Sequence, residues 1–202
     1  MSALRLIAAY FWERARLRLF LPLSLLLAIA GRWMVVSSSA SLNDVALGAL
    51  QALGLTLAFR IWDDLEDREV DRVRHPKRVG ASAVSVAPLY LLGLVLMTIS
   101  IASLVGESFA FHRLAAVSIA AAILSVWYGA RSRDEQHHAL AEHVLAVKYP
   151  LIAYAVAPEL TSDAVTLRIG IVLAVLYVLI CVYEYADDVE LRQFFTSRRS
   201  VP

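Results

Sequence analysis

The sequence predicts an all-α integral membrane protein, a polytopic bundle of about six transmembrane helices. Of the 202 residues, 59% are hydrophobic, above the roughly 45–50% of soluble domains. The charged residues gather in short clusters between long apolar runs. These runs approach the roughly 20 residues that a helix needs to cross a bilayer.

Six apolar runs are candidate membrane spans. The fifth run is short and contains Lys148. We expect this helix to be broken, tilted or protected within the bundle, because an intramembrane charge must find water or a partner. The six runs are Leu19 to Val36, Val45 to Ile61, Val84 to Leu104, Phe109 to Tyr128, Ala141 to Val156 and Leu167 to Tyr183.

The chain is interpreted as one membrane domain, residues 1–202. Residues 1–17 are expected to form an amphipathic helix along the membrane surface, residues 18–192 a six-helix bundle, and residues 193–202 a cytosolic tail. The surface helix is expected to place its apolar side chains on one face: Leu4, Ile7, Ala8, Phe11 and Ala15.

A signal peptide is the alternative for the N-terminus. The apolar run continues past Arg32 and further spans follow it, so a retained first helix is favoured. The single cysteine, Cys181, lies in an apolar run and is interpreted as a packing residue.

Basic residues are distributed unevenly among the loops. Lys and Arg in short loops favour the cytosolic side of a membrane. We therefore expect both termini to be cytosolic, in an integral protein of the inner (plasma) membrane with the lipid bilayer as a partner and no nucleic acid partner. Of the 19 basic residues, 14 lie in segments 1–18, 67–82, 130–140 and 187–202, and none lies in segments 37–43, 105–108 and 157–166.

A cluster of acids follows the second span. Asp63, Asp67 and Asp71 are successive i, i+4 neighbours, and Asp64 is three residues from Asp67. On a helix this spacing places a column of carboxylates on one face, which suits magnesium completed by substrate phosphates. Three basic side chains that could contact phosphate follow: Arg74, Lys77 and Arg78.

A solvated helix end laced with ion pairs is the alternative interpretation of this cluster. Under it, the acids are neutralised by bases of the same helix. The expected pairs are Arg60 with Asp64, Arg68 with Asp64 or Asp71, and Arg72 with Asp67 or Glu69.

The stretch Asp63-Asp64-x-x-Asp67-x-x-x-Asp71 resembles the first aspartate-rich motif of the UbiA superfamily of intramembrane prenyltransferases, and residues 74–78 resemble the basic segment after it. Near the sixth span, Glu184, Asp187 and Asp188 resemble the second acidic motif of that family. The resemblance implies a UbiA-like bundle in which both motifs hold Mg²⁺. It assigns catalytic roles to Asp64, Asp67, Asp71 and Asp188, and metal ligands to Asp63, Asp64, Asp67, Asp71, Glu184, Asp187 and Asp188.

The resemblance also suggests further diphosphate-binding residues beside Arg74, Lys77 and Arg78. Residues 128–133 resemble the family segment in which a Tyr, here Tyr128, precedes a Lys by four residues and contacts diphosphate. Ser132 stands at the Lys position, so Arg131 or Arg133 is expected to supply the charge instead. Lys148 is expected either to bind phosphate or to pair with an acid such as Glu184. His137, His138 and His143 are interpreted as loop or interface residues.

The function implied by the resemblance is a Mg²⁺-dependent prenyltransferase that ionises a polyprenyl diphosphate and transfers the prenyl group to an acceptor, commonly aromatic in the family. Family members have about nine spans, so a homo-oligomer or a protein partner that completes the bundle is one expectation for this chain. The alternatives are a UbiA-type terpene cyclase and a non-catalytic UbiA-like membrane subunit. A CDP-alcohol phosphotransferase is not favoured, because its motif glycines are absent between Asp63 and Asp71.

Overall fold

The computed structural model describes residues 2–35, 41–107, 111–130, 143–158 and 165–187. Of these described residues, 88% are helical and none lies in a strand. The prediction of an all-α fold is therefore confirmed. The helices are α1 Ala3–Glu13, α2 Leu17–Met34, α3 Leu42–Glu66, α4 Arg68–Arg74, α5 Val79–Ser82, α6 Ala87–Glu107, α7 Phe111–Ala130, α9 Lys148–Ala155 and α10 Val165–Asp187.

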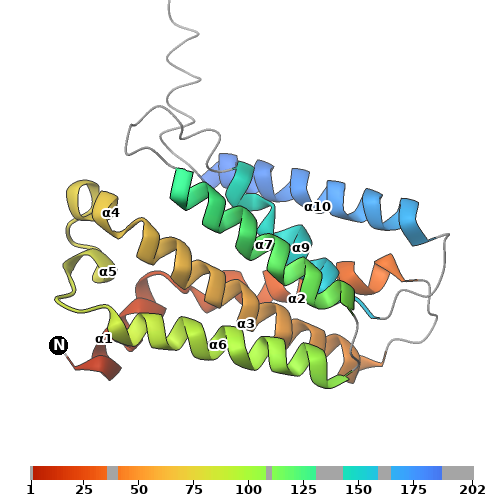
Figure 1. Ribbon diagram of the computed structural model, residues 1–202, viewed down its shortest axis with the longest axis horizontal. Coiled ribbons are helices and arrows are strands. Elements are labelled where there is room, and N and C mark those ends of the chain that lie inside the picture. Colours follow the sequence, from red (N-terminus) through yellow and green to blue (C-terminus); the bar gives the residue numbers. More distant parts are fainter. Residues whose placement is uncertain (1, 36–40, 108–110, 131–142, 159–164, 188–202) are drawn as a thin grey trace, which may run out of the picture.

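The long helices lie roughly along one axis (Figure 1). Four of them, α2, α3, α6 and α7, are long and apolar enough to cross a membrane, which supports the broader prediction of a membrane helix bundle. Helix α10 has 23 residues, with a shorter apolar stretch at Leu167–Tyr183. A count of six spans stays a prediction.

In the described part of the expected fifth span, residues 143–146 are helical and a turn at Val147 separates them from the short helix α9. Helix α9 has eight residues, about 12 Å at about 1.5 Å per residue, against a hydrocarbon core of about 30 Å. It is nevertheless central, because it packs against α2, α3, α7 and α10. Gly31 of α2 permits this close approach, since a Cβ there would lie 2.5 Å from the carbonyl oxygen of Ala153.

Helix α3 lies between two apolar clusters. On one side, Phe59 belongs to a cluster with side chains of α2, α7, α9 and α10. On the other side, Ile61 belongs to a smaller cluster with Leu6 and Tyr10 of α1 and Leu89 of α6. The helix begins with a capping box between Ser41 and Asp44, which satisfies two backbone N–H groups at its first turn.

Helix α1 packs through a face that is shifted from the expected one but still includes Ile7 and Phe11, which are partly buried in the same cluster. Leu6 and Tyr10 are its buried residues, whereas Leu4 and Trp12 are largely exposed. The physical reason is that α1 packs against α5 and α6, so a protein surface selects the inward face. The five expected apolar residues include Ala15, which is buried after the helix ends.

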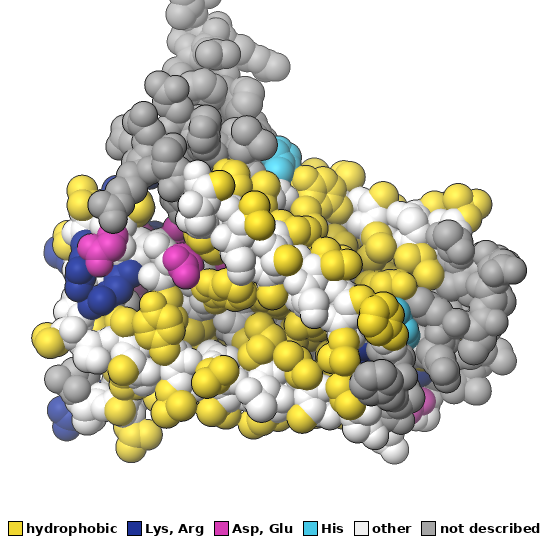
Figure 2. Space-filling model, in the orientation of Figure 1, with side chains coloured by type: hydrophobic (Ala, Val, Ile, Leu, Met, Phe, Trp, Pro, Cys, Tyr) yellow, Lys and Arg dark blue, Asp and Glu magenta, His cyan; other side chains and the backbone are white. Residues whose placement is uncertain are grey.

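Charged side chains gather at one end of the molecule (Figure 2). We call it the α4–α5 end, because those two short helices lie there, together with the C-terminal ends of α3, α7 and α10 (Figure 1). Large apolar side chains are exposed on α6 and α10 along the bundle, for example Leu94 and Leu179. This pattern is typical of helices that face lipid.

Candidate functional site

The aspartates of the first motif stand one helical turn apart at the α4–α5 end. The backbone N–H of Asp67 bonds to the carbonyl of Asp63, and the N–H of Asp71 bonds to the carbonyl of Asp67. Helix α3 ends at Glu66, and Asp67 joins it to α4. The backbone thus has the helical spacing that the sequence predicts.

Asp63 faces the interior of the bundle, where it is 3% exposed. Tyr128 of α7 donates a hydrogen bond to Asp63 Oδ1 at 2.9 Å, and Lys148 of α9 donates to Oδ2 and forms an ion pair with the same carboxylate. A buried carboxylate is tolerated only when it is paired and hydrogen-bonded. Three residues from three separate sequence segments therefore form one polar group.

Lys148 is the first residue of α9 and is 4% exposed. Its ammonium lies 5.3 Å from the ring centroid of Tyr149, within the range of a cation–π interaction. The sequence suggested either a phosphate contact or an acid such as Glu184 as its partner. In the structure its acidic partner is Asp63.

Asp64 faces another side of α3, toward α1. Arg14 binds both carboxylate oxygens, with Nη2 2.5 Å from Oδ1 and Nε 3.3 Å from Oδ2. Tyr10 donates to Oδ2 at 2.7 Å, and Arg60 lies 3.3 Å from Oδ1. Burial and the adjacent Asp64 carboxylate raise the pKa of Tyr10, which keeps its hydroxyl protonated as a donor.

Tyr10 and Arg14 are site residues that the sequence reasoning missed. They are i, i+4 neighbours, so they share one face of a helical segment. That spacing was the available signal, but it could not show that this face meets Asp64, which lies 50 residues beyond Arg14.

The alternative prediction of local ion pairs is partly seen. Arg60 pairs with Asp64 at 3.3 Å and Arg72 with Glu69 at 2.7 Å. Arg68 instead donates to two backbone carbonyls, of Gly80 at 3.1 Å and Ala83 at 2.6 Å. Arg68 belongs to α4, whereas the two carbonyls lie in and directly after α5. The side chain of Arg68 therefore links the two short helices.

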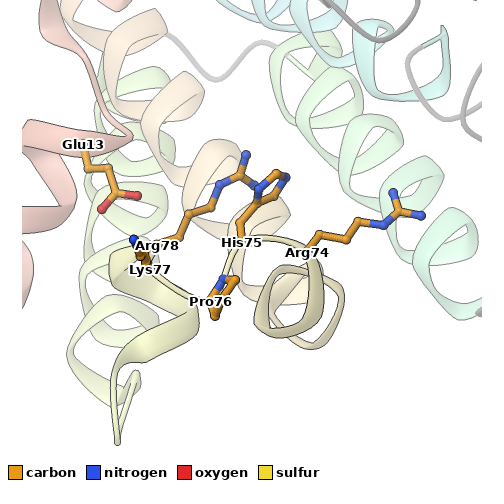
Figure 3. Close-up of a pocket in the computed structure, with 6 residues that line it drawn as sticks. All are labelled: Glu13, Arg74, His75, Pro76, Lys77 and Arg78. Atoms are coloured by element: carbon orange, nitrogen blue, oxygen red, sulfur yellow. The ribbon is translucent and has the colours of Figure 1, made fainter.

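A basic pocket of about 380 Å³ lies at the α4–α5 end. It is lined by Glu13 and residues 74–78, which include the three predicted phosphate-binding residues (Figure 3). Arg78 also pairs with Asp71 at 2.5 Å, and Glu13 accepts a hydrogen bond from the N–H of Val79 at 3.0 Å. In Figure 3 the side chain of Arg74 extends away from Glu13.

The second acidic motif is described only in part. Helix α10 continues to Asp187, and its C-terminal end lies at the α4–α5 end, as the first motif does (Figure 1). The side chains of Glu184 and Asp187 are outside the described part. Asp188, Arg131, His137 and His138 also lie outside the described residues. His143 Nδ1 lies 3.4 Å from the Tyr177 hydroxyl of α10, in keeping with an interface histidine.

The described carboxylates do not fit the Mg²⁺ site that the resemblance implies. Both oxygens of Asp63 and both oxygens of Asp64 are engaged by protein donors. Magnesium requires carboxylate oxygens that can complete a near-octahedral shell. Among the described residues, no three His, Cys, Asp or Glu side chains form a metal-binding group. The ligand roles of Asp67, Asp71 and the second motif stay predictions.

Comparison of the chain with protein-family models, with curated proteins and with solved structures gives no match. The site's own residues define its chemistry. At one end of an apolar bundle, these residues combine buried ion pairs with an open basic pocket. Such a site is suited to an amphiphile with an anionic head and an apolar tail.

Proposed function

We propose that the chain is an intramembrane prenyltransferase that ionises a polyprenyl diphosphate and transfers the prenyl group to an acceptor. The observation that carries the proposal is the contact of Asp63 with both Tyr128 and Lys148. Sequence reasoning selected these residues separately for diphosphate chemistry. Their meeting at one point supports a shared role.

The charges of the site support the binding of a diphosphate head. Arg74 and Lys77 line an open pocket, and basic side chains bind phosphate oxygens through charge-assisted hydrogen bonds. Arg78 and Lys148 would have to exchange an aspartate for phosphate, since each is already ion-paired. We propose that the apolar bundle holds the isoprenoid tail and keeps water from the allylic cation.

The finer predictions belong to the same proposal. We propose six spans, both termini in the cytosol and the plasma membrane as the location, with the α4–α5 end facing the cytosol. A second copy or a protein partner would complete the bundle. The excess of basic residues near this end supports the orientation.

The decisive experiment is incubation of the purified protein in lipid nanodiscs with magnesium and labelled allylic diphosphates. We expect release of diphosphate that stops with a chelator and in Asp67→Ala. Asp44→Ala is the control, because Asp44 is an acid in the first turn of α3, at the end of the helix away from Asp67. Absence of release with every chain length would overturn the proposal. A cyclised hydrocarbon released without an acceptor would indicate a terpene cyclase.

A non-catalytic UbiA-like membrane subunit is the second candidate function. The specific observation in its favour is that protein donors engage all four oxygens of Asp63 and Asp64. In a subunit of this kind, the ion pairs would serve folding. Wild-type cellular function in Asp67→Ala, together with absence of diphosphate release, would support this candidate.

A further inference from the structure

We infer that the outer face of α1, together with Arg16 and Arg18 at the start of α2, binds anionic phospholipids of the surrounding membrane. This surface is separate from the candidate site, and the binding of lipid to it does not depend on prenyl transfer. The place of α1 along the bundle, its outward side chains and the charges beside them all indicate this partner.

Helix α1 lies at the depth where the membrane-crossing helices end. Its buried residues are Leu6 and Tyr10, which belong to one cluster with Leu57 of α3 and Leu89 of α6. Leu57 is nine residues before the end of α3 at Glu66, about 14 Å at about 1.5 Å per residue. Helix α1 therefore lies beside the last turns of α3 and the start of α6 (Figure 1), the depth at which interfacial helices bind a bilayer.

The face of α1 opposite its buried residues turns apolar side chains away from the protein. Leu4 is 80% and Trp12 90% exposed, and Ala8 between them is also exposed. Residues four apart share one face of a helix, and at about 100° per residue Ala8 is turned by about 200° from the buried Leu6. Because tryptophan favours the membrane–water interface, this outer stripe is suited to the boundary between headgroups and acyl chains.

The charges beside this stripe are basic. Arg5 lies on α1, Arg16 and Arg18 lie where the chain enters α2, and all three are exposed. The only acid in the first 20 residues of the sequence is Glu13, which accepts a hydrogen bond from the N–H of Val79. Arginine binds phosphate oxygens through strong, often bidentate hydrogen bonds, and each basic residue near an anionic surface strengthens binding about fivefold.

The same charges favour a lipid surface over a second copy of the chain as the occupant. A two-fold dimer joins the same patch of both subunits, so the arginines of two copies of α1 would face one another. An anionic leaflet instead neutralises all of them. In the orientation proposed above, this face meets the cytosolic leaflet, which contains anionic lipids.

Brominated phospholipids test the contact, because bromine on an acyl chain quenches the fluorescence of a nearby tryptophan. The full chain, at one copy per nanodisc, is compared with Trp12→Phe in discs that contain brominated phosphatidylcholine or brominated phosphatidylglycerol. The quenching that Trp12→Phe removes belongs to Trp12, since the other three tryptophans remain. We expect this part to be at least about twofold larger with phosphatidylglycerol, because that headgroup is anionic.

The possible results separate lipid contact from its preference for charge. Absence of Trp12 quenching by both lipids would overturn the lipid contact, and equal quenching would overturn the anionic preference. Quenching that falls when two copies share a disc would show that a second copy covers α1, which would also overturn the inference.

Arginine variants test whether the charges create the preference. Arg16→Gln and Arg18→Gln should each reduce the extra quenching by phosphatidylglycerol and leave quenching by phosphatidylcholine unchanged, whereas Arg16→Lys should keep the preference because it keeps the charge. Arg72→Gln is the matched control, since it removes one charge from an exposed arginine of α4. An equal loss of preference in Arg72→Gln and Arg16→Gln would contradict a lipid-binding surface at α1.

Discussion

Asp63 and Asp64 are neighbours in the sequence, yet their side chains face two different parts of the molecule. Asp63 points into the bundle and has one cationic partner, Lys148, and one phenol, Tyr128. Asp64 points toward α1 and has two guanidinium partners. Successive residues of an α-helix are separated by about 100°, so adjacent carboxylates meet different elements.

The two aspartates differ in whether another cation can compensate when one partner is lost. On the Asp63 side, the ion pair seen among the described residues is with the buried ammonium of Lys148, and its loss leaves the buried carboxylate without that partner. On the Asp64 side, either arginine can remain when the other is removed. The Asp63 side is therefore expected to govern stability, and the Asp64 side to tolerate change.

The largest expected effect breaks the Asp63 pair. Lys148→Met should lower the free energy of unfolding by roughly 3–5 kcal/mol, because it leaves the buried Asp63 carboxylate without the cation that is ion-paired with it. SDS titration of the protein in mixed micelles measures this loss. The double variant Lys148→Met/Asp63→Asn should recover most of it.

Arg60→Met is the matched single change on the other side. Arg14 remains on Asp64 in that variant, so the loss of stability should be clearly smaller. An equal or larger loss in Arg60→Met would show that the two sides do not differ in the way described.

An intermediate effect is expected from the glycines that let helices approach α9 and α6. A Cβ at Gly31 would meet backbone atoms, Ala153 O at 2.5 Å and Ala157 N at 3.2 Å. Gly31→Ala should cost about 1–3 kcal/mol, the typical penalty of overpacking, and should displace the helix that bears Lys148.

Gly54→Ala provides the comparison, because its Cβ would meet the Ser100 side chain. This hydroxyl can rotate, so the same micelle titration should show a smaller loss, which Ser100→Gly should relieve. A greater loss of stability in Gly54→Ala than in Gly31→Ala would contradict the view that the contact of Gly31 with the backbone near α9 is the tighter one.

The smallest expected effect comes from removing the tyrosine hydroxyl that bonds to each aspartate. Tyr128→Phe and Tyr10→Phe each remove one hydrogen bond to a carboxylate, worth about 1.5 kcal/mol, the lower end for a charged acceptor, because each carboxylate keeps its ion pair. Tyr128→Phe should cost more, because Asp63 then keeps only Lys148 whereas Asp64 keeps both arginines. Chemical unfolding monitored by tryptophan fluorescence measures both variants, and the reverse order would contradict the comparison.

Much of the fold follows from local features of the sequence. The apolar runs at 45–61 and 84–104 fall inside α3 and, apart from three residues, inside α6. Their composition decides this, because a long apolar segment in lipid satisfies its backbone only as a helix. The fifth run differs: in its described part, helical residues 143–146 and the eight-residue α9 are separated by a turn at Val147, and α9 packs against α2, α3, α7 and α10.

The candidate site shows the same division. Spacing alone predicted that Asp63, Asp67 and Asp71 stand one turn apart, since backbone bonds four residues apart impose it. The proximity of Arg60 to Asp64 followed from the same rule. Local spacing could not predict the partners of Asp63, because Lys148 lies 85 residues beyond it.

The sequence by itself determined an all-helical chain with long apolar helices and a charged cluster after α3, because composition and helical periodicity are local properties. Only the tertiary structure decided that Asp63 faces Lys148 and Asp64 faces Arg14. Such pairings depend on how separate helices rotate and pack to bury their charges together. The pairings are therefore a property of the packed bundle and not of any one helix.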